Sequence, residues 1–185
     1  MMAIFVSSRV KAWTILREAM LDDPFLSFYF GIGKIGSFRT SIFLWNALGY
    51  YSKNGKIICL GDAAAVLAIW PPGEFKQRDY GIIVRLLVTL LPSDVKQRWE
   101  VAYPFSADIP EQPHTSIAFL GVRRRSRQNG EGSRLFHECL KQCTMPVYVE
   151  TASRILGDLM LASGFVELRS AKLDDRITVF LFRKT

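Results

Sequence analysis

The sequence lacks any apolar run long enough to cross a lipid bilayer. The best candidate, residues 82–91, carries Arg85 in its middle, whereas a membrane-spanning helix needs roughly 18 apolar residues or more. Residues 1–6 are apolar, but they lack the charged start and the small-residue cleavage site of a signal peptide. These absences predict a cytoplasmic protein that does not associate with a membrane.

Cysteine is scarce, and its spacing is not that of a zinc site. The three cysteines are Cys59, Cys139 and Cys143, of which the last two are four residues apart and share one face of an expected helix. In a cytoplasmic chain such thiols are reduced groups in or near the core, with a redox pair as the alternative. We therefore expect no metal site.

Internal repeats, low-complexity segments and convincing linkers are also absent. A length of 185 residues suits one compact domain. Apolar residues make up 49% of the chain, and thirteen Phe, four Trp and six Tyr are enough to fill a sizeable core. Disorder of the whole chain is excluded on this composition, and we predict a single domain over residues 1–185.

The spacing of apolar residues predicts an α/β fold. Residues 10–21 have helical periodicity, and the Asp-Asp-Pro sequence at 22–24 ends that helix. Residues 56–60 and 63–70 are expected to pair as an antiparallel hairpin. We expect a central mixed, mostly antiparallel sheet of about seven strands flanked by helices. The other expected elements are helices at 38–51, 80–91, 93–101, 130–143 and 153–162, strands at 3–6, 115–122, 147–151, 165–173 and 177–182, and a surface loop at 104–113.

Two glycine-rich segments are candidate phosphate-binding loops. Residues 31–36 fit the dinucleotide pattern G-x-G-x-x-G, and Asp62 follows the next expected strand. A Rossmann fold would require a strand, a tight turn and a helix around this loop. Here the loop follows a helix and the break at 22–24. We therefore favour a flexible connector, with nucleotide binding as the alternative.

The second segment, residues 127–132, has the expected context for binding phosphate. It follows the strand at 115–122 and opens an apolar-periodic helix that contains Leu135 and Phe136. The first N–H groups of a helix have no partner within it, and the helix dipole is positive there. Gly130 and Gly132 would let a diphosphate approach this backbone closely. This pattern predicts a phosphate site without identifying the ligand.

Basic residues gather beside this loop. The formal net charge is +7, which favours anionic ligands. The basic cluster could also be a solvated face, a localisation-like patch or a nucleic-acid site. It lacks interleaved aromatic residues and any nucleic-acid-binding motif, so we expect no nucleic-acid partner. Its members are Arg123, Arg124, Arg125, Arg127 and Arg134.

The ordered set of motifs resembles the GNAT N-acetyltransferases. Leu120-Gly121-Val122, followed by Arg127-x-x-Gly130-x-Gly132, is similar to motif A of that family. The match continues through residues 147–151, Ser153 and Gly164-Phe165. Upstream, residues 22–25 (DDPF) and 68–73 (AIWPPG) resemble segments of the puromycin N-acetyltransferase-like branch, and His114 matches the His that opens the fourth strand there. The resemblance spans about residues 10 to 183.

The resemblance implies acetyl-CoA as acyl donor, with its pantetheine arm between splayed strands four and five. Residues of about 114–185 would form the coenzyme-binding core, and the N-terminal half would form the acceptor side. No metal is implied, and a monomer or a homodimer is expected. The residues that would hold acetyl-CoA, carried over by position, are Leu120, Gly121, Val122, Arg123, Arg125, Arg127, Gln128, Asn129, Gly130, Glu131, Gly132, Ser133 and Ser153.

The sequence departs from the family pattern at the proton donor to the leaving thiolate. Four residues before Gly164 the family usually has a Tyr, but this chain has Met160, which cannot donate a proton. The local candidates for proton transfer are His114, Ser116 and Glu150, with Tyr148 as a further one. His114 is either a solvated surface residue or a base acting through water, and Glu150 is either structural or a proton acceptor.

Candidate acceptor-binding residues lie in the N-terminal half. Asp23 is either a helix cap or an anchor for a cationic amine, and Trp70 is either a core residue or a wall of the acceptor pocket. Phe25 and Tyr29 complete the set. The leading hypothesis is an N-acetyltransferase in which a small-molecule primary amine attacks acetyl-CoA directly. The alternatives are acetylation of a protein or peptide amine, and a coenzyme-A-binding protein with reduced or lost catalysis.

Overall fold

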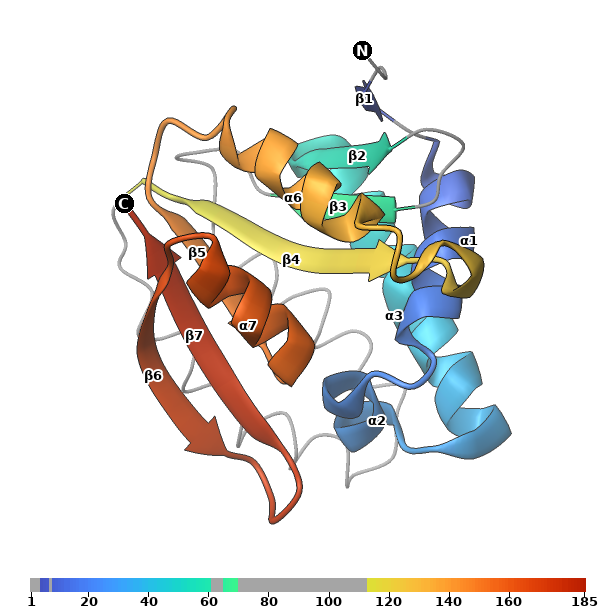
Figure 1. Ribbon diagram of the computed structural model, residues 1–185. Helices are drawn as coiled ribbons and strands as arrows, with labels where there is room; N and C mark the ends of the chain where they lie inside the picture. Colours follow the sequence, from blue (N-terminus) through green and yellow to red (C-terminus); the bar gives the residue numbers. More distant parts are fainter. Residues whose placement is uncertain (1–3, 7, 61–64, 70–112) are drawn as a thin grey trace.

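The structure is a computed structural model that describes residues 4–6, 8–60, 65–69 and 113–185. Its centre is a mixed sheet of seven strands in the order β1-β2-β3-β4-β5-β7-β6 (Figure 1). Neighbouring strands are antiparallel except for β4 and β5, which are parallel. The expectation of an α/β fold with a mixed sheet flanked by helices is therefore confirmed.

Each described element begins and ends close to a turn or capping signal. The strands are β1 (Ile4–Val6), β2 (Lys56–Leu60), β3 (Ala65–Ile69), β4 (Thr115–Val122), β5 (Val147–Thr151), β6 (Val166–Lys172) and β7 (Thr178–Lys184). The helices are α1 (Arg9–Met20), α2 (Pro24–Phe30), α3 (Gly33–Asn54), α6 (Glu131–Leu140) and α7 (Arg154–Ala162), with a short 3-10 helix, η2 (Arg124–Ser126). The segments expected at 80–91, 93–101 and 104–112 lie outside the described residues.

The Asp-Asp-Pro break both ends α1 and starts α2, which the sequence prediction missed. Asp23 is the N-cap of α2, and its Oδ1 accepts a hydrogen bond of 2.9 Å from the N–H of Leu26. Pro24 occupies the first helical position, where its missing N–H removes no hydrogen bond. The residues that stop one helix therefore meet the requirements for starting the next one.

The segment 31–36 is a helix start and not a flexible connector, so that prediction was wrong. Gly31 caps α2 with φ 81°, and α3 begins at Gly33 with φ 76°. A Cβ on Gly36 would collide with the carbonyl oxygen of Gly31. The glycines therefore allow a tight turn between two helices. Because α2 and not a strand precedes this turn, the nucleotide-binding alternative fails as well.

The predicted helix at 130–143 ends three residues early. After Leu140 the chain turns, and the N–H of Cys143 bonds the carbonyl of Leu140 at 3.1 Å. Cys143 therefore lies outside α6, although its Sγ still donates to the carbonyl of Cys139 at 3.3 Å. Cys59 and Cys139 are buried, Cys143 is half-buried, and all three are free thiols.

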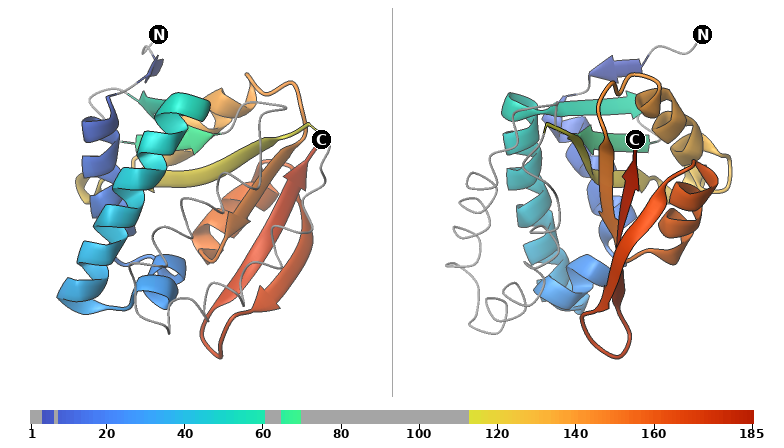
Figure 2. Two further views of the ribbon diagram at one scale, coloured as in Figure 1. Left: turned by 180° about the vertical axis from the view of Figure 1, so that it is seen from behind. Right: turned by 90° about the vertical axis from the view of Figure 1, so that its left-hand side faces the viewer.

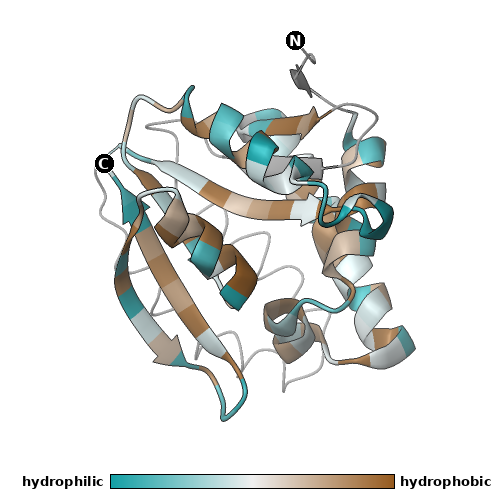
Figure 3. Ribbon diagram, in the orientation of Figure 1, coloured by the Kyte–Doolittle hydropathy of each residue, from teal (hydrophilic) through white to brown (hydrophobic). Residues whose placement is uncertain are grey.

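Helices cover both faces of the sheet, and apolar side chains fill the two layers between them. Figure 2 shows α1 and α3 on one face and α6 and α7 on the other. The first layer includes Leu16, Tyr29 and Phe119, and the second includes Phe136 and Phe182. Figure 3 shows apolar residues along the central strands and a hydrophilic η2. In the described part of the chain, no helix combines the length and the apolar character needed to cross a membrane.

Candidate active site

The sheet opens between its two parallel strands. β4 and β5 pair only from Thr115 and Val147 to Ile117 and Val149. β4 then continues to Val122 and β5 to Thr151 without pairing to each other. The strands therefore diverge toward their C-terminal ends. A gap of this kind lets a ligand reach backbone groups that a continuous sheet would occupy.

A β-bulge in β4 reverses the side-chain alternation at the point where the strands diverge. The consecutive residues Ala68 and Ile69 of β3 pair with Phe119 and Ile117, so Ala118 is the extra residue. Ile117 packs in the layer with α6 and α7, whereas Phe119 packs in the layer with α1 and α3. The bulge thus lets neighbouring parts of β4 supply large side chains to both layers.

One continuous cleft runs through the opening. Its volume is about 990 Å³, near the upper end of the roughly 300–1,000 Å³ that small-molecule sites occupy. The wall includes the start of α6, the diverging parts of β4 and β5, the side of α7, and α2 with the turn before it. Of the residues expected to hold acetyl-CoA, those on the wall are Leu120, Gly121, Val122, Arg127, Gln128, Gly130, Glu131, Gly132, Ser133 and Ser153.

The α6 end of the cleft presents helix N–H groups that no side chain of the helix caps. Gly130 is the N-cap with φ 72° and makes no side-chain cap hydrogen bond. A Cβ at Gly130 would meet nothing within 4 Å, so a ligand has access to this backbone. Gln128 also has a positive φ, of 70°. Such uncapped groups at a helix start favour an anion.

Gly132 has a different role from Gly130. A Cβ added to Gly132 would lie 2.8 Å from Cγ2 of Val122, so the glycine allows α6 to approach β4. The neighbouring Glu131, in the first turn of α6, has an Oε2 without a hydrogen-bond partner among the described residues. Only Gly130 therefore fits the expected role of leaving open space for a diphosphate.

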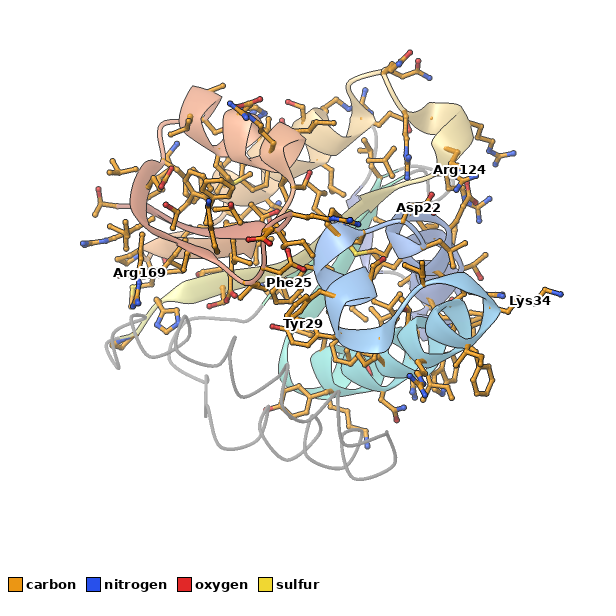
Figure 4. The ribbon with its side chains drawn as sticks, turned by 90° about the horizontal axis from the view of Figure 1, so that it is seen from below. Asp22, Phe25, Tyr29, Lys34, Arg124 and Arg169 are labelled. Atoms are coloured by element: carbon orange, nitrogen blue, oxygen red, sulfur yellow. The ribbon has the colours of Figure 1, made fainter. Side chains whose placement is uncertain are left out.

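Two arginines of the basic cluster beside α6, Arg124 and Arg127, are engaged with the protein itself. Arg124 forms an ion pair of 2.6 Å with Asp22, and its N–H bonds Glu18 at 2.8 Å. Figure 4 shows Asp22 and Arg124 side by side. The guanidinium of Arg127 donates to the carbonyl of Ala19 at 3.2 Å. The cluster therefore ties η2 to α1.

Three residues expected to contact the coenzyme do not line the cleft. They are Arg123, Arg125 and Asn129. Arg127 does line the wall, and it is the only cationic side chain among the described residues that do so. The positive character of this end comes from Arg127 and the start of α6, and less from the arginine cluster than the sequence pattern indicated.

The cleft wall also carries two half-buried carboxyl groups, those of Asp23 and Glu150. Burial raises the pKa of Glu150 from its ordinary 4.5 to about 7. Burial also raises the pKa of Asp23, against the opposing effect of hydrogen bonds from the N–H groups of Leu26 and Phe25. A carboxylate with a pKa near 7 is suited to accept a proton at neutral pH.

Aromatic side chains form the apolar surface around these carboxyl groups. Phe25 and Tyr29, one helical turn apart on α2, have ring centroids 4.7 Å apart in an edge-to-face arrangement. Figure 4 shows both extending from α2 toward the middle of the molecule, whereas Lys34 points outward. The aromatic residues that line the cleft are Phe25, Tyr29, Phe43, Tyr51, Phe119 and Tyr148.

Three of these aromatic residues, Phe43, Tyr51 and Phe119, were not expected at the site, and Tyr148 was expected only as a candidate for proton transfer. Phe43 and Tyr51 lie on α3, and Phe119 and Tyr148 lie on β4 and β5. Their apolar character alone indicates only that they are buried. Trp70, the remaining expected residue of this region, lies outside the described part of the chain.

His114 and Ser116 have different surroundings. His114 is only 5% exposed and packs edge-on against the ring of Tyr148, with centroids 5.2 Å apart, so it is not a solvated surface residue. It does not line the cleft, whereas Ser116 does. The buried Oγ of Ser116 has no hydrogen-bond partner among the described residues, and this leaves it open to a ligand in the cleft.

Met160 is a core residue beside the cleft. Its side chain is 0% exposed and faces a small cavity of about 10 Å³ that it shares with Ile117 and Glu150. Ser153, at the cleft wall, instead caps α7, accepting a hydrogen bond of 3.4 Å from the N–H of Leu156. Met160, the departure from the family pattern, and Ser153 therefore both occupy well-defined structural positions.

Comparisons with protein-family models and with curated proteins find no match. Solved structures do match over nearly the whole chain. An arylalkylamine N-acetyltransferase from Aedes aegypti has a TM-score of 0.72 at 15% identity, covering 100% of this chain and 98% of its own. A histone-acetyltransferase-related acetyltransferase from Corynebacterium glutamicum has 0.70 at 18% identity, covering 98% and 96%. An agmatine N-acetyltransferase has 0.58 at 15% identity, covering 99% and 98%.

These likenesses establish the fold. The chain has the fold of the GNAT acetyltransferases. The arrangement that defines it here is a mixed sheet that opens between parallel strands β4 and β5, with α6 starting beside the opening.

Proposed function

We propose that the chain is an N-acetyltransferase that transfers an acetyl group from acetyl-CoA to a primary amine of a small molecule. The observation that carries this proposal is that a single cleft is lined by groups of both charge signs. Uncapped helix N–H groups and Arg127 lie on its wall, and so do the carboxyl groups of Asp23 and Glu150. Such a cleft suits a phosphate-bearing donor and a cationic acceptor at the same time.

The α6 end of the cleft has groups that fit acetyl-CoA. Amides at the start of α6 would hold the pyrophosphate, since Gly130 leaves open space in front of them. Backbone groups of Leu120 to Val122 are not paired with β5 and would hydrogen-bond the pantetheine arm. When bound, the thioester supplies the acetyl group and a thiolate as leaving group.

Glu150 is the residue that we assign to proton acceptance. The attacking amine must lose its proton as its nitrogen forms the C–N bond and the C–S bond breaks. Glu150 lines the cleft, and its pKa of about 7 allows it to hold that proton near neutral pH. Ser116 would hydrogen-bond the reacting groups through its unpartnered Oγ, and the thiolate would take its proton from solvent.

We also propose that the chain forms a single domain, in which residues 114–185 form the half that binds the acetyl donor. The proposed acceptor is a small molecule. Among the structural neighbours, two are described by their action on arylalkylamines and on agmatine, and one by its relation to histone acetyltransferases. Small amines and protein amines therefore both occur with this fold. The buried aromatic lining beside Asp23 favours a small amine here.

Coenzyme A binding with reduced catalysis is a second candidate, supported by Met160. A thioether in a fully buried position supplies no acid to the leaving group. A thiolate of ordinary pKa, about 8.5, is nevertheless a tolerable leaving group without one. Retention of Glu150 and Ser116 on the cleft wall favours an active enzyme.

Calorimetry with acetyl-CoA tests the donor site. Because Gly130 lies in the left-handed region and faces open space, Asn and Asp can both replace it without collision. Gly130→Asp should weaken acetyl-CoA at least tenfold by charge repulsion, and the matched Gly130→Asn should not. Equal acetyl-CoA affinities of the two variants would show that the pyrophosphate does not bind at this loop.

A thiol-release assay with a panel of primary amines tests the transfer itself. The wild-type protein should release free coenzyme A only when an amine is present, and Glu150→Gln should lower the rate about 100-fold or more. Tight acetyl-CoA binding without amine-dependent release would favour the non-catalytic candidate.

A further inference from the structure

We infer that the acceptor is a monoamine with a flat aromatic body, and that α2 selects it. This inference rests on the proposed function, because it names the acceptor of the same cleft. It excludes polyamines and lysine side chains as preferred acceptors. Three features carry it: the aromatic lining, the number of available carboxyl groups, and the construction of α2.

Six aromatic side chains from the described elements α2, α3, β4 and β5 line the cleft. Phe25 and Tyr29 meet edge to face at 4.7 Å, and Phe119 contacts Phe43 at 6.1 Å and Tyr51 at 6.0 Å between centroids. Tilted and edge-on rings present both faces and edges to a ligand, which an aromatic ring matches better than a flexible alkyl chain. Tyr29 and Tyr51 are each only 1% exposed, so their positions are held by packing.

The carboxyl groups of Asp23 and Glu150 suit one ammonium group. Glu150 is assigned to proton acceptance, which leaves Asp23 to hold the cation. Asp22 also borders the cleft, but it is ion-paired with Arg124 at 2.6 Å. Glu131, the fourth carboxyl group on the wall among the described residues, belongs to the first turn of α6 and not to the elements that carry the aromatic residues. A second ammonium or guanidinium group in the aromatic region would therefore have to compete for Asp23 and Glu150. Burying a charge left unpaired in that way is strongly unfavourable.

A single short helix supplies both the anion and the first aromatic wall. Asp23 caps α2 through the N–H of Leu26, and Pro24 fixes the start of the helix. Phe25 and Tyr29 then lie on one face, at positions i and i+4. The distance between carboxylate and rings is thereby set by helix geometry, which fixes the separation of amine and aromatic ring in the acceptor.

Matched acceptors test this inference at saturating acetyl-CoA. The probes are 2-phenylethylamine, 2-cyclohexylethylamine, 1,4-diaminobutane and a short lysine-containing peptide, with free thiol as readout. We expect kcat/KM to be highest for 2-phenylethylamine, roughly tenfold lower for the cyclohexyl analogue and at least about 100-fold lower for the other two. A diamine or peptide that equals or exceeds 2-phenylethylamine would overturn the inference and leave the acetyltransferase proposal intact.

Two variants of α2 localise the selectivity. Phe25→Leu should reduce the ratio of kcat/KM between the phenyl and cyclohexyl amines to about one, because the ring wall is lost. Phe28→Leu is the control, since Phe28 lies on the same helix and does not line the cleft. Ratios are compared within each variant, so a loss of folded protein does not affect them. If Phe25→Leu leaves the ratio of kcat/KM between the phenyl and cyclohexyl amines unchanged, α2 does not select the acceptor.

Binding provides a readout that does not depend on turnover. If no amine is acetylated, the proposed function fails, but the acceptor class is still tested by thermal unfolding in the presence of coenzyme A. A rise in Tm with 2-phenylethylamine and none with 1,4-diaminobutane would support the inference. Equal shifts, or none, would overturn it.

Discussion

Replacing Glu150 by Gln removes a carboxylate whose ionisation the folded protein opposes. Burial raises the pKa of this group from 4.5 to about 7, so the folded state holds its proton over a pH range in which the unfolded chain releases it. Between these two values the wild-type protein loses stability as the pH rises, and above about 7 the loss is complete. Glutamine has the same shape and does not ionise.

The magnitude follows from the size of the pKa change. A rise from 4.5 to about 7 corresponds to roughly 3 kcal/mol of destabilisation at pH 8, and to less than about 1 kcal/mol at pH 5. Because Glu150 is half-buried and borders an open cleft, roughly 3 kcal/mol is an upper bound. We therefore expect Glu150→Gln to be about 1–3 kcal/mol more stable than wild type at pH 8 and nearly equal to it at pH 5.

Thermal unfolding of both proteins across this pH range measures the difference. For a chain of this size, 1 kcal/mol changes Tm by roughly 2–4 °C. Glu167→Gln, at an exposed position on β6, is the matched control and should show no pH-dependent gain. If Glu150→Gln gains no stability at pH 8, or gains as much at pH 5, the carboxyl group is not desolvated, and its assignment as the proton acceptor loses its physical basis.

Three further predictions concern activity and packing. The kcat/KM for the amine should rise with pH through about 7, as Glu150 loses its proton, and a pH profile of Glu150→Gln should lack that rise. Gly132→Ala should lower the free energy of unfolding by about 1–3 kcal/mol, because the added Cβ would crowd Val122. Gly157→Ala is the control and should not lower it, because its Cβ would lie 3.4 Å from the nearest atom. Denaturant unfolding of both variants measures the difference. Met160→Tyr should lower Tm, because a phenol is larger than the small cavity beside Met160. In the thiol-release assay it should raise kcat by less than about 100-fold. A larger rise in kcat would show that the missing acid limits the rate of the enzyme.

Local signals were sufficient to predict most of the described fold. The sequence pattern indicated a strand over 115–122 followed by a helix that starts at glycine, and the structure has both elements. The omission of α2 has a definite cause. Asp and Pro at 23 and 24 carry the same signal for a helix stop as for a helix start. Residues 24–30 are apolar except for Ser27, so no periodicity decides between the two.

The site was only partly predictable from the sequence, because tertiary contacts decide whether a charged side chain is free to bind a ligand or is paired within the protein. A run of arginines indicates an anion site, but Arg124 is held by Asp22 and Glu18, more than a hundred residues away in the chain. The aromatic lining was hidden for the same reason. Phe43 and Tyr51 have the apolar spacing of any buried helix face, and only the packing of α3 against the sheet brings them to the cleft.

The bulge at Ala118 divides β4 into two segments that are out of phase with each other. Ser116, before the bulge, and Leu120 and Val122, after it, all line the cleft. Each segment can therefore change its contribution to the cleft without altering the face that the other presents, although one strand encodes both. Deletion of Ala118 would remove the bulge and leave Ile117 and Phe119 adjacent and in opposite layers, as they already are. β4 can therefore lose its bulge residue without moving Phe119, whereas deletion of one residue after Phe119 would turn the residues that follow to the opposite face.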